Sequence, residues 1–138
     1  MALTRSLPDT AAYSAFLRGH RDVQRALQRV DRIVLTPVVL GELRAGFVRG
    51  GRRAKHEAEL ARFRESPRVD VVDMDEGTAD RYAAIVEGLR GAGTPIPTND
   101  VWIAASAMQH GLRLITTDAH FRHIAQVIVD FFDPVSGG

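Results

Sequence analysis

Short apolar segments alternate with longer amphipathic segments along almost the whole chain. The segments 32–36, 112–117 and 127–132 are rich in Val, Ile, Leu and Phe, and each has the length of a strand rather than of a helix. Strands that alternate with helices along a sequence are typical of parallel sheets. The alternation therefore predicts an α/β fold in which helices cover both faces of a central parallel sheet of about five strands.

The expected strands cover residues 2–7, 32–36, 68–74, 112–117 and 127–132. The expected helices cover residues 10–17, 22–30, 38–48, 52–65, 75–90, 99–110 and 119–124. Pro37 suits the first turn of the third helix, and two glycines end that helix, so residues 38–65 are predicted to form a helical hairpin. Because the sequence has no repeat or linker, we expect one domain over 1–138, with 134–138 as a flexible tail.

Size and composition exclude several classes of protein. The chain has 138 residues, of which 45% are apolar and 25% charged, an ordinary globular balance. It contains no cysteine, which excludes disulfides and thiolate metal sites. No apolar run approaches the ~20 residues of a membrane span, and the opening segment MALTRSLPDT has no secretory apolar region. We therefore expect a cytoplasmic protein without a membrane partner.

The near-neutral net charge of +1 hides an asymmetry between the two halves. Residues 1–68 carry 14 Lys/Arg and 7 Asp/Glu, whereas residues 69–138 carry 4 and 10. All the basic residues except Lys55 are arginine. An arginine-rich surface suits phosphate binding, but a genomic composition bias towards arginine would produce the same count. Both interpretations stay open.

The segment PTNDVWIAAS places a carboxylate at the start of an apolar helical face. In a helix that begins near Asn99, Asp100 shares its side with four apolar residues, namely Ile103, Ala104, Ala107 and Met108. A carboxylate in a first helical turn is also favoured by the helix dipole, which would leave it in solvent. Because burying an unpaired carboxylate is costly, the position on this face indicates a special role for Asp100.

Three further acids are candidates, although each has an ordinary explanation by itself. Asp9 and Asp118 follow predicted strands and precede helices, so each is a possible helix N-cap; Thr10 is an alternative cap that would free Asp9. Glu42 lies at the border of the packed face of its helix, where a partly exposed glutamate is common. The carboxyl ends of parallel strands are, however, where α/β folds collect their ligands.

Four carboxylates in one cleft would repel one another unless a cation lay between them. Mg²⁺ prefers oxygen ligands and keeps several waters, so the acids predict a divalent metal site. Such an ion can activate water and stabilise charge on a phosphoryl oxygen. The five histidines show no zinc-ligand spacing such as His-Glu-x-x-His.

The sequence resembles the PIN-domain ribonucleases, and among them the VapC toxins of type II toxin–antitoxin systems. The resemblance covers residues 7–132 and rests on DTAAYSAFLRG, VVLGELRAG and, most specifically, RYAAIVEGLRGAGTPIPTNDVWIAASAMQHGLRLITTDAHF. It implies a PIN-like α/β/α sandwich and metal-dependent endonucleolytic cleavage of RNA, with Mg²⁺ or its substitute Mn²⁺. The family's acidic cluster corresponds to Asp9, Glu42, Asp100 and Asp118.

The resemblance also implies partners and supporting residues. A cognate VapB-type antitoxin, an RNA substrate and a homodimer are expected. The antitoxin groove is expected to involve Tyr13, Phe16, Leu17 and Phe47, for which core packing is the alternative. Asn99 and Thr116 are candidates for orienting carboxylates or water, or are simply a helix cap and a strand residue. Candidates for binding RNA phosphates, or else a solvated helical face, are Arg44, Arg49, Arg52, Arg53 and Lys55.

One position departs from the family pattern. The family usually has an apolar strand residue before the first aspartate, where this chain has Pro8. Proline lacks an N–H and is awkward in a central strand, so we expect a short or distorted first strand. The alternative function is therefore a catalytically weak PIN domain that acts as an RNA- or protein-binding module. Other acidic α/β proteins fit less well, because a phosphoacceptor receiver needs a lysine near its last strand and dehalogenase-type phosphatases need Asp-x-Asp.

Overall fold

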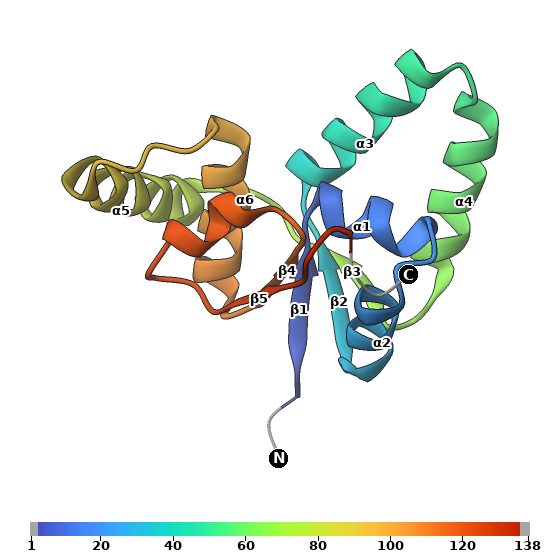
Figure 1. Ribbon diagram of the computed structural model, residues 1–138, viewed down its shortest axis with the longest axis horizontal. Helices are drawn as coiled ribbons and strands as arrows, with labels where there is room; N and C mark the ends of the chain where they lie inside the picture. Colours follow the sequence, from blue (N-terminus) through green and yellow to red (C-terminus); the bar gives the residue numbers. More distant parts are fainter. Residues whose placement is uncertain (1–2, 136–138) are drawn as a thin grey trace.

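A computed structural model describes residues 3–135, and its centre is a five-stranded parallel sheet (Figure 1). The strands are β1 (Arg5–Pro8), β2 (Arg32–Leu35), β3 (Val69–Val71), β4 (Arg113–Thr116) and β5 (Val129–Phe131), in the spatial order β3-β2-β1-β4-β5. The helices are α1 (Thr10–Leu17), α2 (Arg21–Arg29), α3 (Pro37–Gly50), α4 (Arg53–Glu65), α5 (Glu76–Ala92), α6 (Thr98–His110) and the 3₁₀ helix η1 (Ala119–His123). The predicted α/β fold with a parallel sheet is confirmed.

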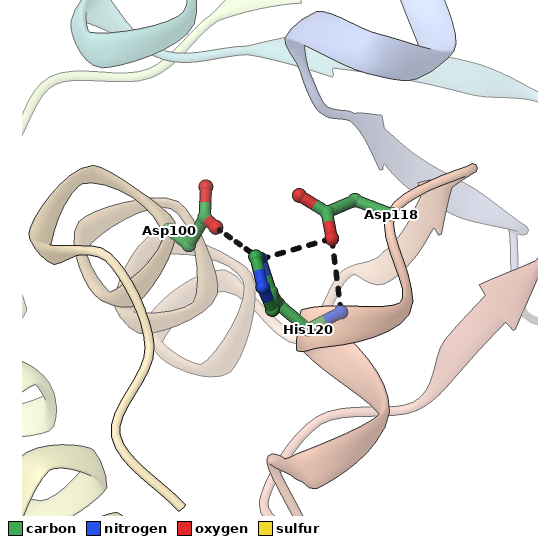
Figure 2. Close-up of side chains that lie close together, drawn as sticks. All are labelled: Asp100, Asp118 and His120. Carbon is green, nitrogen blue, oxygen red and sulfur yellow. Dashed lines mark hydrogen bonds and ion pairs between the residues drawn. The ribbon is translucent and has the colours of Figure 1, made fainter.

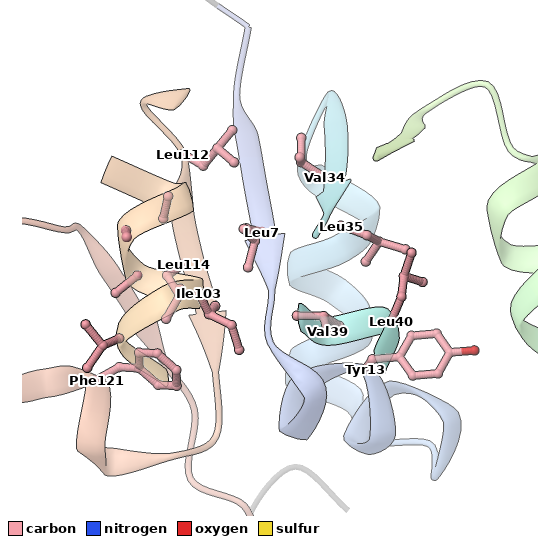
Figure 3. Packing of buried hydrophobic residues seen from close by; sticks show 14 of the residues in the cluster. Leu7, Tyr13, Val34, Leu35, Val39, Leu40, Ile103, Leu112, Leu114 and Phe121 are labelled. Atoms are coloured by element: carbon pink, nitrogen blue, oxygen red, sulfur yellow. The ribbon is translucent and has the colours of Figure 1, made fainter. Parts of the chain in front are cut away.

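Side chains that alternate along the strands form two apolar layers, one on each face of the sheet. Leu7 and Leu114 point towards α6 and η1, where Ile103 and Phe121 pack against them (Figure 3). Ile115, the next residue along β4, belongs to a separate cluster with residues of α1 and α2. The fold is therefore an α/β/α sandwich, with α5 and α6 on one side of the sheet and α1 and α2 on the other (Figure 1).

Helices α3 and α4 form the predicted hairpin, which extends from the carboxyl end of β2 (Figure 1). Pro37 occupies the first turn of α3, and Gly51 ends this helix with a φ of 77°, a left-handed conformation that glycine adopts without strain. The buried residues Leu43, Phe47 and Leu60 join the hairpin to the main core. Its packing fixes the direction of α3, and therefore of every side chain on it.

Pro8 is accommodated at the end of β1, the central strand. It pairs with Ile115 of β4, whereas the register with β2 ends at Ser6. Successive N–H groups of a strand point to opposite neighbours, and the next N–H, that of Asp9, donates to the Ile115 carbonyl at 3.1 Å. The missing N–H of proline therefore faces β2, where pairing has already ended, and Asp9 leaves the sheet in regular register.

Several boundaries differ from the expected ones. The first strand was expected at 2–7 but begins at Arg5 and includes Pro8; residue 2 lies outside the described residues. The edge strands β3 and β5 are shorter than the expected 68–74 and 127–132, because each pairs on one side only. Residues 119–123 form a 3₁₀ helix. Of the expected tail, 136–138 lie outside the described residues. Among the helices of residues 3–135, none is long and apolar enough to cross a bilayer.

Candidate metal centre

Four acids from separate parts of the chain line one cleft at the carboxyl edge of the sheet. Asp9 follows β1, Asp118 follows β4, Glu42 lies on α3, and Asp100 lies in the first turn of α6. Two adjoining cavities of about 470 and 270 Å³ share Glu42, Asp100 and Asp118 in their walls, and Asp9 lines the smaller one. The topology thus brings together acids that are up to 109 positions apart in the sequence.

Asp9 lies at the bottom of the cleft, with 3% of its surface exposed. Its Oδ1 accepts the Ala12 N–H at 2.8 Å, so Asp9 itself caps α1, and the alternative in which Thr10 is the cap is wrong. Its Oδ2 accepts the Thr116 hydroxyl at 2.6 Å. Burial raises the pKa of Asp9 to about 7; the two hydrogen bonds oppose this shift, and the charges of Asp100 and Asp118 add to it.

Thr116 links two of the acidic segments. It is fully buried at the end of β4, and its hydroxyl donates to Asp9 while accepting the N–H of Asp118 at 2.8 Å. The Thr116 hydroxyl thus fixes both the carboxylate of Asp9 and the backbone of Asp118. This arrangement explains why a threonine is placed in a position that an apolar strand residue would otherwise occupy.

Asp100 and Asp118 face each other across the cleft, with His120 beside both (Figure 2). His120 Nδ1 lies 3.1 Å from Asp118 Oδ1 and 3.7 Å from Asp100 Oδ2. Asp118 also accepts the His120 N–H at 2.9 Å and so caps η1. Burial, and then the charges of Asp118 and Glu42, raise the pKa of Asp100 to about 6, against the opposing effect of His120.

Glu42 is held towards the cleft by two side chains. Its Oε1 accepts the Thr10 hydroxyl at 2.6 Å, and its Oε2 accepts the Asn99 amide at 3.3 Å. Asn99 therefore contacts an acid rather than capping α6, whose N-cap position is Pro97. The apolar face behind Asp100 is buried as its spacing predicts, with Ile103 and Ala107 each 1% exposed.

The charges of this cleft suit a divalent cation. Among residues 3–135, His120 is the one basic side chain that forms an ion pair with any of the four acids. Burial, and then the charges of neighbouring acids, raise the pKa values of Asp9 and Asp100, so a cation beside them would favour their charged forms. Ligand atoms of Asp100, Asp118 and His120 all lie within 4.8 Å of one another. A carboxylate-rich site of this kind fits Mg²⁺ or Mn²⁺.

Two residues of the cleft were missed at the level of sequence. Testing the histidines only for zinc-ligand spacing overlooked His120, which lies two positions after Asp118 and therefore at the same strand end. Thr10 was considered only as a helix cap, although the residue after Asp9 starts the first turn beside the same edge. In both cases proximity to a candidate aspartate was the available signal.

The five basic residues proposed to bind phosphates do not line either cavity of the cleft. Arg44 forms an ion pair with Glu57 at 3.3 Å across the α3–α4 hairpin. The other four are exposed near the end of the hairpin, namely Arg49, Arg52, Arg53 and Lys55. This surface could contact only parts of a substrate that extend beyond the acids.

Comparison with known proteins agrees with the fold. Residues 6–127 match the sequence profile of the PIN domain. The chain belongs to the PIN domain family. This PIN domain is 33% identical over 129 residues to a protein named Ribonuclease VapC4 from Mycobacterium tuberculosis. The aligned region covers 94% of this chain and 98% of that relative. The family resemblance read from the sequence is therefore confirmed.

Solved structures share the architecture of this PIN domain. A structure of VapBC2 from Rickettsia felis bound to a DNA fragment from their promoter superposes with a TM-score of 0.83 at 22% identity, covering 94% of this chain and all of that one. A VapBC-5 structure from Mycobacterium tuberculosis gives 0.73 at 27% identity, covering 94% and 99%. The predicted PIN-like α/β/α sandwich is thereby confirmed.

Proposed function

We propose that this protein is the toxin of a type II toxin–antitoxin module and a metal-dependent endoribonuclease. The observation that carries the proposal is the cleft in which Asp9, Glu42, Asp100 and Asp118 meet without an arginine or lysine partner among residues 3–135. The relative named Ribonuclease VapC4 supports RNA as the substrate class. Pro8 gives no support to a weakened binding module, because β1 delivers Asp9 to the cleft in register.

The proposed reaction is hydrolysis of an RNA phosphodiester by in-line displacement, leaving a 5′-phosphate and a 3′-hydroxyl. Asp9, Asp100 and Asp118 are the residues that would hold the ion. When bound, Mg²⁺ or Mn²⁺ would supply an activated water and offset charge on the phosphoryl oxygens. Glu42, held by Thr10 and Asn99, would accept a hydrogen bond from the attacking water and orient it.

Thr116 and Asn99 would act as positioning residues. Thr116 fixes the carboxylate of Asp9 and the backbone of Asp118 together, so its loss would misplace two acids. Asn99 restrains Glu42 from the neighbouring helix. Neither residue needs to contact RNA for this role.

The exposed basic residues of the hairpin would bind phosphates at a distance from the scissile bond. RNA is a chain of negative charges, and an acidic cleft repels it until cations lie nearby. Arg49, Arg52, Arg53 and Lys55 would provide that attraction beyond the cleft, whereas Arg44 is already paired with Glu57. Binding through phosphates positions RNA without selecting its sequence.

A VapB-type antitoxin would occupy the groove between α1 and α3. This groove of about 290 Å³ is lined by Tyr13, Leu17 and Phe47, and Glu42 at its rim connects it to the acidic cleft. An apolar antitoxin segment would fill the groove, and a following basic residue would reach the acids. Phe16, expected in the groove, instead packs on Phe63 with ring centroids 5.6 Å apart. A homodimer is proposed on the family resemblance alone.

RNA cleavage by purified protein, followed on a labelled oligonucleotide, tests the proposal. We expect EDTA to abolish cleavage and added Mg²⁺ or Mn²⁺ to restore it. The ends of the products should be a 5′-phosphate and a 3′-hydroxyl. Cleavage that persists at full rate in EDTA would refute the proposed mechanism.

A further inference from the structure

Among the described residues, His120 is the one histidine that lines the cleft. Nδ1 points between two carboxylates, 3.1 Å from Asp118 Oδ1 and 3.7 Å from Asp100 Oδ2 (Figure 2). Neighbouring ligands of an octahedral ion at about 2.1 Å lie roughly 3 Å apart. Nδ1 thus lies at ligand spacing from Asp118 Oδ1 and slightly farther from Asp100 Oδ2, and all three atoms lie within 4.8 Å of one another.

Local structure holds the ring in this position. Asp118 caps η1 by accepting the backbone N–H of His120, so the short helix begins at the strand end and turns its second residue into the cleft. About half of the His120 side chain remains exposed, so RNA or water can approach it. His123, on the same helix, is exposed, and the structure records no ion pair or hydrogen bond for its side chain among the described residues.

We infer that His120 is a nitrogen ligand of the metal centre and that it makes the site prefer Mn²⁺ to Mg²⁺, an inference that rests on the proposed function. Mg²⁺ takes oxygen ligands almost entirely, whereas imidazole suits transition-metal ions. An imidazole added to the carboxylates of Asp9, Asp100 and Asp118 thus favours Mn²⁺ over Mg²⁺. As a ligand, His120 would be a neutral imidazole that presents the Nδ1 lone pair to the ion and carries its proton on Nε2.

A different role for His120 would be to partner the two aspartates as a cation. In that case a bound ion would displace it, because both groups bring positive charge to the same carboxylates. The two roles make opposite predictions for metal affinity. Removing a ligand weakens binding, whereas removing a competing cation strengthens it.

Mn²⁺ binding to the metal-free, full-length protein separates these roles without any measurement of activity. Titration followed by electron paramagnetic resonance gives the Mn²⁺ affinity, and competition gives that of Mg²⁺. We expect His120→Asn to lower the Mn²⁺ affinity at least roughly tenfold, with a smaller loss for Mg²⁺. His123→Asn is the matched control and should leave both affinities unchanged.

A spectroscopic signature and an oxygen-ligand variant complete the test. Pulsed electron paramagnetic resonance of bound Mn²⁺ should detect coupling to an imidazole nitrogen that disappears in His120→Asn. His120→Asp, which restores an all-oxygen set, should shift the ratio of affinities towards Mg²⁺.

Failure of this inference and failure of the proposed function give different results. If Asp100→Asn abolishes Mn²⁺ binding while His120→Asn binds Mn²⁺ as well as or better than the unaltered protein and no nitrogen coupling is seen, His120 is not a ligand. The proposed function would then stand. If the unaltered protein binds neither ion at millimolar concentration, the metal centre itself is wrong, and this inference falls with it.

Discussion

Acidic residues near the amino ends of the strands are paired with arginines, whereas those at the carboxyl ends are not. Near the amino ends of the strands, Arg32 of β2 donates to Asp70 of β3, with Nε at 3.0 Å. Arg113 of β4 likewise forms two hydrogen bonds with Asp130 of β5, at 2.9 and 2.7 Å. At the carboxyl edge, the acids of the cleft have His120 alone as a basic partner among the described residues.

This difference favours the carboxyl ends of the strands as the place where a cation binds. The chain contains 17 arginines, and its amino edge shows that an arginine on an adjacent strand can neutralise an aspartate. At the carboxyl ends of the strands, burial and then the neighbouring acids raise the pKa values of Asp9 and Asp100, and their charged forms disfavour the folded state when no ion is present. A cost of this kind is typical of functional sites.

Asp100→Asn gives the largest expected effect, because it acts on the uncompensated edge. RNA cleavage should fall at least roughly 100-fold, equivalent to about 2.7 kcal/mol of transition-state stabilisation. In EDTA the same variant should unfold at a higher temperature than the unaltered protein, since a repelled, half-buried charge is removed. Initial cleavage rates and thermal unfolding measure the two effects.

Asp130→Asn is the control at the compensated edge and should change neither cleavage nor metal binding. Retention of full cleavage by Asp100→Asn would show that the cleft is not the reaction centre. A lower melting temperature for this variant in EDTA would show that Asp100 is not repelled there.

Thr116→Val should have the next largest effect. Valine keeps the shape of the side chain but removes the hydroxyl that holds Asp9 and the Asp118 backbone, which leaves the partly buried Asp118 N–H without its acceptor. We expect a loss of roughly 10–100-fold in Mn²⁺ affinity, as for other residues that orient metal ligands. Thr116→Ser retains the hydroxyl and should recover most of the affinity; equal losses in both variants would mean that packing, not the hydroxyl, is responsible.

The stability of the metal-free protein should depend on pH through Asp9. Its pKa is 3.8 in the unfolded chain and about 7 in the folded protein, so between these values the folded state binds more protons. The free energy of unfolding should therefore fall as the pH rises from about 4 to about 7. Denaturant titrations in EDTA at several pH values measure this slope.

Asp9→Asn should make that profile shallower, because asparagine does not titrate and still caps a helix. The raised pKa of Asp100, about 6, accounts for the dependence that remains. Addition of Mn²⁺ at pH 7 should recover stability in the unaltered protein only. An unchanged slope in Asp9→Asn would assign the pH dependence to other groups.

The layered fold could be predicted from the sequence because it depends on patterns that extend over many residues. Strand–helix alternation is repeated along the chain, so small errors at each boundary do not alter the topology. The errors concern strand boundaries that depend on neighbouring strands. Pro8 is tolerated because the pairing of β1 with β2 has ended before it, and β3 is short because it lies at the edge of the sheet. Neither circumstance is visible in the local sequence.

The acids of the candidate site, and Asn99 and Thr116 as residues that contact them, could be predicted from the sequence, but which acid each partner contacts could not. Asp9 and Asp118 follow apolar strands, and Asp100 starts an apolar face, so each has a local signal. The contacts Thr10–Glu42 and Asn99–Glu42 join residues 32 and 57 positions apart, which no local pattern reveals. Of the two caps considered for α1, Asp9 is the actual one, and it still faces the cleft because its two oxygens accept different hydrogen bonds.

Charge reversal on the α3–α4 hairpin should have a moderate effect on RNA binding. It tests whether the basic residues of the hairpin attract RNA to the acidic cleft. Arg52→Glu with Arg53→Glu should weaken RNA binding and reduce the slope of log K against log salt by about 0.7 for each RNA phosphate that these arginines would otherwise neutralise. The same charge change at Arg25 and Arg29 of α2 is the control. If both double variants weaken binding equally, the effect reflects overall charge rather than the hairpin surface.

Breaking the Arg113–Asp130 pair should have the smallest effect of all. The two side chains are 45% and 29% exposed, and pairs of this kind contribute about 0–1 kcal/mol to stability. Asp130→Asn should therefore lower the free energy of unfolding by at most about 1 kcal/mol, measured by denaturant titration, and should leave RNA cleavage unchanged. If it impaired cleavage as strongly as Asp100→Asn, the two edges would not be functionally distinct, because a neutralised acid would matter as much as an uncompensated one.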